Sequence, residues 1–260
     1  VEGEGEIINI NPSDTNDIID KNSNATSNQL SDAINAAQIA QRKWEDVGIE
    51  KRANILHDIG SELINQSKEI GTLLSREEGK TLPEGIGEVV RSGQQFQYYA
   101  ASALRQFGEN IASTREGVSV ELTREPIGVC GIISPWNFPI AIAAWKSAPA
   151  MAFGNAIVLK PASQTPASAI ALTKIISEQK DIPEGLFNLV LGSGGTIGHQ
   201  ISEHKNINAI SFTGSVNVGQ TIYKDAAKTM KKMQLEMGSK NPLLIMDDAD
   251  LEIAVTCATN

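Results

Sequence analysis

Apolar residues recur every three or four positions through much of the first hundred residues, the spacing of one face of an α-helix. The pattern predicts helices that begin near Ser27, Ile49 and Lys68, and a longer one after Pro83 that continues to Phe107. The residues before Ser27 predict two short strands joined by turns. We therefore expect residues 1–107 to be a mostly helical part that packs against another layer.

Residues 108–126 follow a different pattern. Val118, Val120 and Leu122 alternate with polar residues, which predicts a half-exposed strand. We interpret this strand as part of a hairpin that begins near Ile111. Because it lies between two parts of different pattern, we expect the hairpin to project from the body and to pair with a neighbouring chain.

From residue 127 onward, short apolar runs alternate with helical stretches. Such alternation is typical of a parallel sheet covered by helices on both faces. The expected fold class is therefore α/β, with a Rossmann-like parallel sheet and flanking helices in residues 127–238. The predicted strands are Gly128–Ser134, Ala156–Lys160, Leu186–Leu191, Ala209–Thr213, Lys232–Glu236 and Leu243–Met246. The predicted helices are Ile140–Phe153, Pro166–Gln179, Thr196–Glu203 and Val216–Met230.

The composition argues against several classes of partner. The chain has 260 residues, with 22 Lys and Arg against 31 Asp and Glu and a formal net charge of -9. An acidic chain without a basic run is poorly suited to bind nucleic acid or an anionic membrane. The longest apolar stretches, such as residues 140–145, are too short to span a bilayer.

Cysteine and histidine usage predicts neither disulfides nor a metal site. Cys130 and Cys257 cannot form a disulfide framework, and the first residues lack the pattern of a signal peptide. These features predict a reducing, cytoplasmic setting. His57, His199 and His204 fall on different predicted elements, so we expect no metal to be bound.

Ligands of parallel α/β sheets bind at the carboxyl ends of the strands, so we expect the functional residues in the turns after the predicted strands. After the first strand, Asn137 lies within Pro135-Trp136-Asn137-Phe138-Pro139. Held between two prolines, its amide suits a hydrogen-bond donor to a developing oxyanion, worth roughly 3–4 kcal/mol in the transition state. The alternative is an asparagine that only caps the turn.

The next two turns have features of phosphate sites. Lys160 opens a turn that ends where a helix starts, and a cation beside a helix N-terminus suits a phosphate or ribose hydroxyls. The turn that begins at Gly192 follows a strand and opens a helix, as a dinucleotide-binding turn does. Its spacing departs from that motif because Ile197 occupies the place of the last glycine, so a tight turn without a ligand is an equally good interpretation.

The last two turns carry a further phosphate candidate and an acid. Gly214 permits a close approach of the backbone, and Ser215 can cap the next helix, either alone or beside a pyrophosphate. Glu236 points away from Leu235 and Met237 at the end of its strand. An acid at a strand end is most often solvated, but in a cleft it would serve as a general base.

Taken in order, these turns resemble those of the aldehyde dehydrogenase superfamily. The chain reads PWNFP at 135–139, KPASQTP at 160–166, the glycine-rich turn from 192, FTGS at 212–215 and LEMGSKNP at 235–242. Each motif is weak alone, and their order makes the resemblance specific. It covers essentially the whole chain. Residues 91–107 and 123–135 are most similar to the branch that oxidises semialdehydes of short dicarboxylic acids.

The resemblance implies a mechanism in which a cysteine thiolate attacks the aldehyde to form a thiohemiacetal. Hydride then passes to NAD(P), and a water activated by a glutamate releases the acid from the thioester. Asn137 would be the oxyanion donor, Glu236 the general base, and Lys160 the contact to the adenosine ribose or its phosphate. The implied cofactor-binding residues are Ser134, Pro135, Trp136, Lys160, Ala162, Ser163, Gly192, Gly195, Phe212, Thr213, Gly214, Ser215, Val218, Glu236, Met237 and Gly238.

Two positions depart from the family pattern. Ser163 stands where many NAD-preferring members have a glutamate that binds the ribose 2′-hydroxyl. A carboxylate there would repel a 2′-phosphate by about 1–4 kcal/mol at ~4 Å. Because Ser163 lacks that charge and Lys160 is nearby, we expect NADP to be preferred and NAD to be possible. Ser239 replaces a usual glycine and could shift the approach to Glu236.

The family nucleophile lies further beyond the glutamate than this chain extends. Cys130 falls mid-strand and Cys257 in the closing helical pattern, so we expect both to be packing residues. Residues 1–107 and 127–238 would form the cofactor-binding domain, and residues 239–260 the start of a catalytic domain. We expect the chain alone to be inactive.

Two other functions stay open. One is a non-catalytic nucleotide-binding or assembly module, and the other is an acyl-phosphate or acyl-thioester reductase of the same fold. Glu236 argues against the reductase, because it suits hydrolysis of a thioester to the free acid. Family members commonly assemble through the hairpin, here about residues 111–124. We therefore expect the full-length protein to be a homodimer or homotetramer that acts on a small aldehyde.

Overall fold

A five-stranded parallel sheet lies at the centre of the computed structural model, which describes residues 3–105 and 108–259. The strand order is β7-β6-β5-β8-β9, and all neighbours run parallel. This is the Rossmann-like α/β arrangement that the sequence predicted. The strands are β5 (Val129–Ile133), β6 (Ala156–Lys160), β7 (Phe187–Leu189), β8 (Ala209–Gly214) and β9 (Lys232–Met237).

The order of the strands reverses between β5 and β8. The chain moves outward from β5 through β6 to β7, then returns to place β8 and β9 on the other side of β5. Loops that leave β5 and β8 therefore diverge, which opens a crevice at the carboxyl ends of these strands. The register pairs Ile133 with Phe212, so the turn after Ile133 and the turn after Gly214 lie at the same edge.

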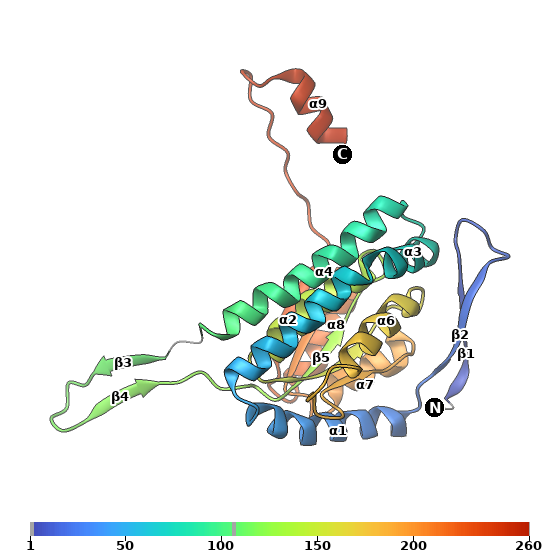
Figure 1. The fold of residues 1–260 in the computed structure, drawn as a ribbon. Helices are drawn as coiled ribbons and strands as arrows, with labels where there is room; N and C mark the ends of the chain where they lie inside the picture. The colour runs from blue at the N-terminus through green and yellow to red at the C-terminus, as the bar shows by residue number, and fades with distance from the viewer. Residues whose placement is uncertain (1–2, 106–107, 260) are drawn as a thin grey trace.

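Helices flank the sheet, as Figure 1 shows. Because the chain crosses in opposite directions in the two halves, right-handed crossovers place their helices on opposite faces. The helices are α5 (Pro139–Ala152) and α6 (Pro166–Ser177) in one half, and α7 (His199–Glu203) and α8 (Val216–Ala227) in the other.

The N-terminal helices form a further layer, and their presence confirms the helical pattern of the first hundred residues. The helices α2 (Ile49–Asn65), α3 (Ser67–Glu78) and α4 (Leu82–Ala103) pack against α5 and α6. The helix α1 (Ser27–Glu45) runs along β6, and its Trp44 Nε1 donates to Met151 O at 2.7 Å. The predicted helix end at Phe107 lies outside the described residues.

Two antiparallel ribbons complete the fold. The strands β1 (Glu4–Ile10) and β2 (Ile18–Asn24) pair near the N-terminus. The strands β3 (Glu109–Ala112) and β4 (Ser119–Leu122) form the predicted hairpin, which projects from the body (Figure 1). Every residue of both hairpin strands is exposed.

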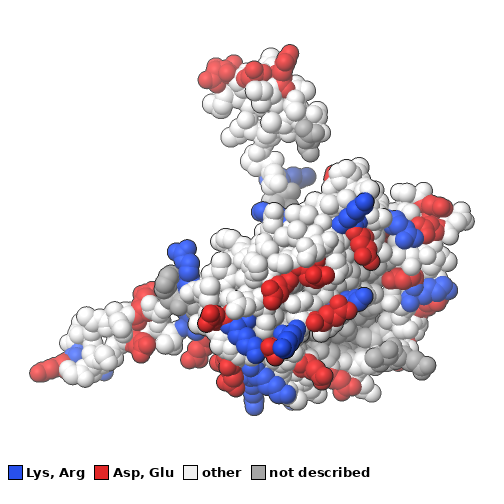
Figure 2. Space-filling model, in the orientation of Figure 1, with Lys and Arg blue, Asp and Glu red and all other residues white. Residues whose placement is uncertain are grey.

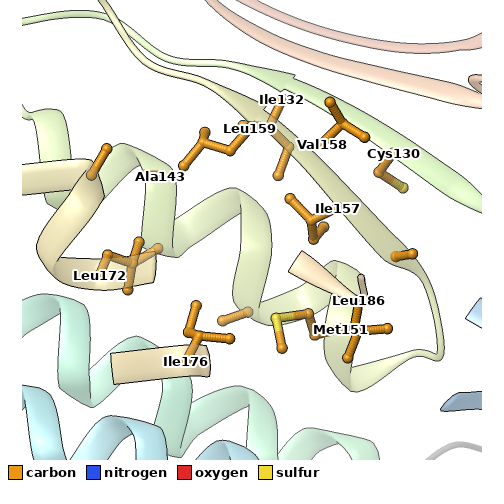
Figure 3. Packing of buried hydrophobic residues seen from close by; sticks show 14 of the residues in the cluster. Cys130, Ile132, Ala143, Met151, Ile157, Val158, Leu159, Leu172, Ile176 and Leu186 are labelled. Carbon is orange, nitrogen blue, oxygen red and sulfur yellow. The ribbon is translucent and has the colours of Figure 1, made fainter. Parts of the chain in front are cut away.

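The main core lies between the sheet and the helices α5 and α6 (Figure 3). Val158 of β6 and Ile132 of β5 are fully buried, as the continuous apolar pattern of these strands predicted. Leu172 and Ile176 of α6 approach the same cluster and are also fully buried. The predicted packing role of Cys130 is confirmed, because it is only 8% exposed in this cluster.

Two predicted elements differ from the structure. Residues 243–246 form no strand; they have no neighbouring strand among the described residues, and Leu244 is 82% exposed. Beyond them the helix α9 (Leu251–Thr259) stands away from the body, and Cys257 on it is exposed rather than packed (Figure 1). The helix predicted for 196–203 begins earlier, as a π-helical turn at Gly194–Gly198 that leads into α7.

Charged residues are spread over the body in Figure 2, and acidic side chains gather on the projecting segment that carries α9.

No helix in residues 3–105 and 108–259 is long and apolar enough to cross a membrane.

A buried glutamate joins the helical layer to the sheet. The helix α6 begins at Pro166, and its N-cap residue Thr165 makes no side-chain cap. Glu77 of α3, only 3% exposed, takes over this role by accepting hydrogen bonds from the backbone N–H groups of Ala167 and Ser168. It also accepts from Ser168 Oγ at 2.6 Å and from Asn9 Nδ2 at 2.8 Å. Burial raises the pKa of Glu77, and these hydrogen bonds oppose that shift.

We predict that Glu77→Ala lowers the free energy of unfolding by about 2–3 kcal/mol, because it leaves several buried donors without an acceptor. Chemical denaturation measures this change. The matched control is Glu69→Ala, an exposed position on the same helix, for which a change within about 0.5 kcal/mol is expected. Equal effects of the two substitutions would contradict the capping role of Glu77.

Candidate functional site

A cavity with a volume of about 1020 Å³ opens at the carboxyl ends of β5, β8 and β9. Asn137 and Glu236, predicted to act together, both line it. Its other walls come from α4, from the end of α3 and the segment that follows it, and from the first turns of α5. Of the sequence-predicted residues, this cavity is lined by Pro135, Trp136, Asn137, Thr213, Gly214, Ser215, Glu236, Met237 and Gly238.

The turn that carries Asn137 is held at both ends. At its start, the Ser134 N–H donates to Lys160 O at 3.2 Å, which links the turns after β5 and β6. At its end, Lys80 Nζ donates to Asn137 O at 2.9 Å. The Asn137 side chain is exposed to the cavity and has no hydrogen-bond partner in the described part of the chain, so its amide is free to donate to a ligand.

Glu236 lies on β9, where exposed and half-buried residues alternate as predicted. Its Oε2 accepts a hydrogen bond from Thr213 Oγ1 of the neighbouring strand at 3.2 Å. The carboxylate is exposed on the cavity wall, so it keeps its contact with solvent. An exposed carboxylate held by one hydroxyl can accept a proton from a water molecule in the cavity.

Lys146 lies beside Glu236, and sequence analysis did not predict it as a residue of the site. It projects from α5, is 9% exposed, and donates to Ser211 Oγ and Gln234 Oε1, both at 2.9 Å. Burial lowers the pKa of Lys146 to about 8, and the nearby Glu236 carboxylate opposes that shift. The available signal was that Lys146 is the single charged residue within α5.

A second cavity of about 430 Å³ lies on the other side of the start of α8. Gly195 and Val218, both predicted cofactor residues, line it. Ser215 caps α8 as predicted, with its Oγ accepting from Val218 N at 3.4 Å. The N–H groups of Val216 and Asn217 precede the first intrahelical hydrogen bonds and can face an anion.

The remaining predicted residues lie behind these two cavities and line neither of them. Lys160 is 4% exposed, and its Nζ donates to Gly192 O at 3.0 Å and to Pro161 O at 2.6 Å. Burial lowers the pKa of Lys160 to about 8. Ser163 Oγ also donates to Gly192 O, at 3.2 Å. The residues in this group are Ser134, Lys160, Ala162, Ser163, Gly192 and Phe212.

Gly192 has a backbone conformation that only glycine adopts easily. Its φ is +153°, and a Cβ at this position would lie 2.5 Å from the Ile197 side chain. The turn thus places the Gly192 carbonyl against Lys160 and Ser163, and the next residues lead into the π-helical turn. The glycine-rich turn is therefore joined to the turn after β6.

These features fit a dinucleotide. The two cavities flank the N-terminus of α8, where free N–H groups suit a pyrophosphate. Around the second cavity, a Cβ on Gly194 would meet no atom within 4 Å, and one on Gly195 only Ser193 Oγ at 4.0 Å, which leaves room for a ligand. The donor set and the open space therefore suit NAD or NADP.

Sequence analysis also did not predict three other residues that line the first cavity. Lys80, Glu88 and Arg91 come from α4 and the segment before it, far from the turns after the strands. Glu88 is 6% exposed, whereas Arg91 is exposed. In the described residues, the Arg91 guanidinium has no ion pair or hydrogen bond. Helical periodicity alone did not separate these residues from ordinary surface charges.

His199, Glu203 and Asp225 come together although they lie on two helices. Their potential ligand atoms all lie within 4.8 Å of one another. Sequence analysis did not predict this cluster, because it considered only the positions of the histidines. Lys228 Nζ lies 2.7 Å from Glu203 Oε1 and 3.1 Å from Asp225 Oδ1, so a cation of the chain already pairs with both carboxylates.

The structure gives Cys130 no nucleophilic character. It lies within β5, and burial raises the pKa of its thiol to about 12. A thiol needs to ionise to act as a nucleophile, so a buried Cys130 is suited only to packing.

Comparison with known proteins agrees with this geometry. Residues 1–260 match the sequence profile of the Aldehyde dehydrogenase family. The chain is 42% identical over 253 residues to alpha-ketoglutaric semialdehyde dehydrogenase of Bacillus subtilis, which covers 96% of this chain and 51% of that protein. It is 38% identical over 261 residues to 2,5-dioxopentanoate dehydrogenase of Saccharolobus solfataricus, with 99% and 54% covered.

A solved structure shows the same fold. Betaine aldehyde dehydrogenase of Staphylococcus aureus, crystallised in complex with NAD+, superposes with a TM-score of 0.95 at 34% sequence identity. The match covers 98% of this chain and 51% of that one. The chain thus spans about half the length of the relatives that it matches. Over all of its 260 residues, it belongs to the aldehyde dehydrogenase family.

Proposed function

We propose that the protein carrying this chain oxidises an aldehyde to its carboxylic acid with NAD or NADP. The observation that supports this most directly is that Asn137 and Glu236 line one cavity at the strand ends. Overall, aldehyde, oxidised cofactor and water would give acid, reduced cofactor and a proton. The bound nicotinamide would supply the acceptor for the hydride that leaves the aldehyde carbon.

The residues of this chain have separate roles in this proposal. The free Asn137 amide donates a hydrogen bond to the carbonyl oxygen as negative charge develops on it. Glu236 accepts a proton from the water that attacks the acyl carbon. The family mechanism also needs a thiol nucleophile, which we place outside these 260 residues because Cys130 is buried and Cys257 lies on the projecting α9.

The proposed cofactor position follows from the two cavities. Gly195 and Val218 would contact the adenosine portion, and the start of α8 at Ser215 would hold the pyrophosphate. Trp136 and Met237 would line the nicotinamide end. Lys160 lies behind the glycine-rich turn and would be close to the ribose of the bound cofactor.

The same proposal includes a preference for NADP. Ser163 carries no charge, and Lys160 lies at the same turn with both residues donating to Gly192 O. A 2′-phosphate at this turn would therefore lie near the positive charge of the buried Lys160 and would meet no carboxylate from Ser163.

We further propose that the substrate carries a carboxylate at its far end. The two curated relatives named above act, by their names, on aldehydes of this kind. The Arg91 guanidinium, which has no ion pair or hydrogen bond within residues 3–105 and 108–259, offers a partner for such a carboxylate on the cavity wall. Glu88 and Lys80, which line the same wall, already neutralise each other at 2.6 Å.

The protein is also proposed to assemble as a homodimer or homotetramer through the hairpin β3–β4. Ile111, Val120 and Leu122 are exposed on it, and an exposed strand edge tends to pair with another chain.

Asn137→Ala is expected to lower kcat for aldehyde oxidation by about 100- to 1000-fold, with little change in KM, because the donor acts mainly in the transition state. Steady-state kinetics of the full-length protein measures this loss. Asn65→Ala, an exposed asparagine at the end of α2, is the control and should retain the parent rate. An Asn137→Ala variant with the parent kcat would exclude the oxyanion role, whereas a full-length protein that oxidises no aldehyde would favour a non-catalytic module.

Ser163→Glu is expected to lower the preference for NADP over NAD by about tenfold or more, because the new carboxylate repels the 2′-phosphate. The ratio of kcat/KM for the two cofactors measures this change. Ser163→Gln has nearly the same shape without the charge and should have a smaller effect. A parent enzyme that favours NAD by more than tenfold would contradict the proposal.

Arg91→Ala is expected to raise KM for a dicarboxylic semialdehyde by about 10- to 100-fold, since a hydrogen bond to a charged group is lost. Its KM for propanal, which has no carboxylate, should stay unchanged. Arg91→Lys keeps the charge and should retain part of the affinity. Equal increases of KM for both substrates would show that Arg91 does not recognise the carboxylate.

A further inference from the structure

We infer that Lys80 is a positioning residue that fixes the turn of Asn137, with Glu88 as its anchor. The inference rests on the proposed role of Asn137 as oxyanion donor and adds residues that act through it. Lys80 and Glu88 both belong to the N-terminal helical part, far from this turn in sequence.

Lys80 makes its contacts on one side of the turn. Its Nζ lies 2.9 Å from Asn137 O, 2.6 Å from Glu88 Oε2 and 4.3 Å from the centre of the Phe138 ring. A carboxylate oxygen of Glu78 lies 3.6 Å away. The ammonium thus holds the backbone of Asn137 and the side chain of the next residue at once.

Glu88 holds the other end of the same turn. The helix α5 begins at Pro139, which has no N–H, and its N-cap Phe138 has no side chain able to accept a hydrogen bond. Glu88 Oε1 accepts from the N–H groups of Ile140 and Ala141 at 3.2 and 3.0 Å. One carboxylate therefore caps α5 and also orients Lys80.

Between Pro135 and Pro139, the three central residues of the turn have little packing that would fix their conformation. Trp136, Asn137 and Phe138 are all exposed, and the turn has no regular secondary structure. If Lys80 were absent, the peptide between Asn137 and Phe138 could rotate, and the Asn137 side chain would change direction with it. A donor displaced by about 1 Å can cost about 100-fold in rate.

The burial of the pair makes this restraint strong. The side chain of Lys80 is 10% exposed and that of Glu88 is 2% exposed. Charges that are shielded from water attract each other more strongly than charges at the surface. The Lys80–Glu88 pair is thus a stiff support that reaches the turn through two short contacts.

The experiment compares Lys80→Met with Asn137→Ala and with the double variant in the full-length protein. We expect Lys80→Met to lower kcat by about 10- to 100-fold, with KM for the aldehyde changed less than about threefold. In the Asn137→Ala background the same substitution should cause almost no further loss, because the residue that it positions is gone.

A second readout does not depend on turnover. Hydrogen–deuterium exchange of residues 134–141 should be faster in Lys80→Met than in the parent. The control is Arg76→Met, which removes an ion pair of 2.6 Å between Arg76 of α3 and Asp17, neither of which lines the cavity. That variant should keep the parent kcat and the parent exchange in residues 134–141.

Several outcomes would overturn the inference. A Lys80→Met variant with the parent kcat would do so, as would a loss that simply multiplies with that of Asn137→Ala. If Lys80→Met does not fold, Glu88→Gln is compared in the same cycle, because it keeps an acceptor for α5 and removes the charge that orients Lys80. If Asn137→Ala itself keeps the parent rate, Asn137 is not the oxyanion donor and the inference fails with it, whereas a full-length protein that oxidises no aldehyde would contradict the proposed function itself.

Discussion

A helix that begins with proline after a residue whose side chain makes no cap leaves backbone N–H groups unsatisfied, and the contact between the helical layer and the sheet meets that need. Both α5 and α6 begin in this way, at Pro139 and Pro166. In each case a buried glutamate from another helix accepts the free N–H groups, Glu88 for α5 and Glu77 for α6. The helical layer therefore completes the two helices that follow the first strands of the sheet, and neither part is satisfied without the other.

Local patterns in the sequence were sufficient for most of the architecture. The apolar runs correctly predicted the five strands of the parallel sheet. The turns that carry Asn137 and Ser215 follow these strands at the expected edge. The predicted strand at 243–246 was wrong because a strand needs a neighbour for its hydrogen bonds, and periodicity does not say whether one exists. Periodicity also did not predict the early π-helical turn. That turn depends on Gly192, whose carbonyl accepts a hydrogen bond from Lys160.

The supporting residues of the site could not be found in this way. Lys80 and Asn137 are 57 positions apart, and Glu77 and Ser168 are 91 apart. Pairs of this kind depend on how helices cross in space, which neither spacing nor composition encodes. Lys146 is different, because the sequence contained a signal for it: it is the single charged residue in an apolar helix. The residues at the carboxyl ends of the strands were thus easier to place from the sequence than the residues of other elements that contact them.

The burial of Lys146 and Lys160 has a consequence for the behaviour of the fold in alkaline solution. Lys146 and Lys160 have pKa values of about 8 in the folded chain, below the ordinary value of 10.5. Between these values the unfolded chain binds more protons than the folded one, so folding releases protons there. The contribution of both lysines to stability therefore increases as the pH rises through this range, and alkalinity relieves the cost of burying their charges.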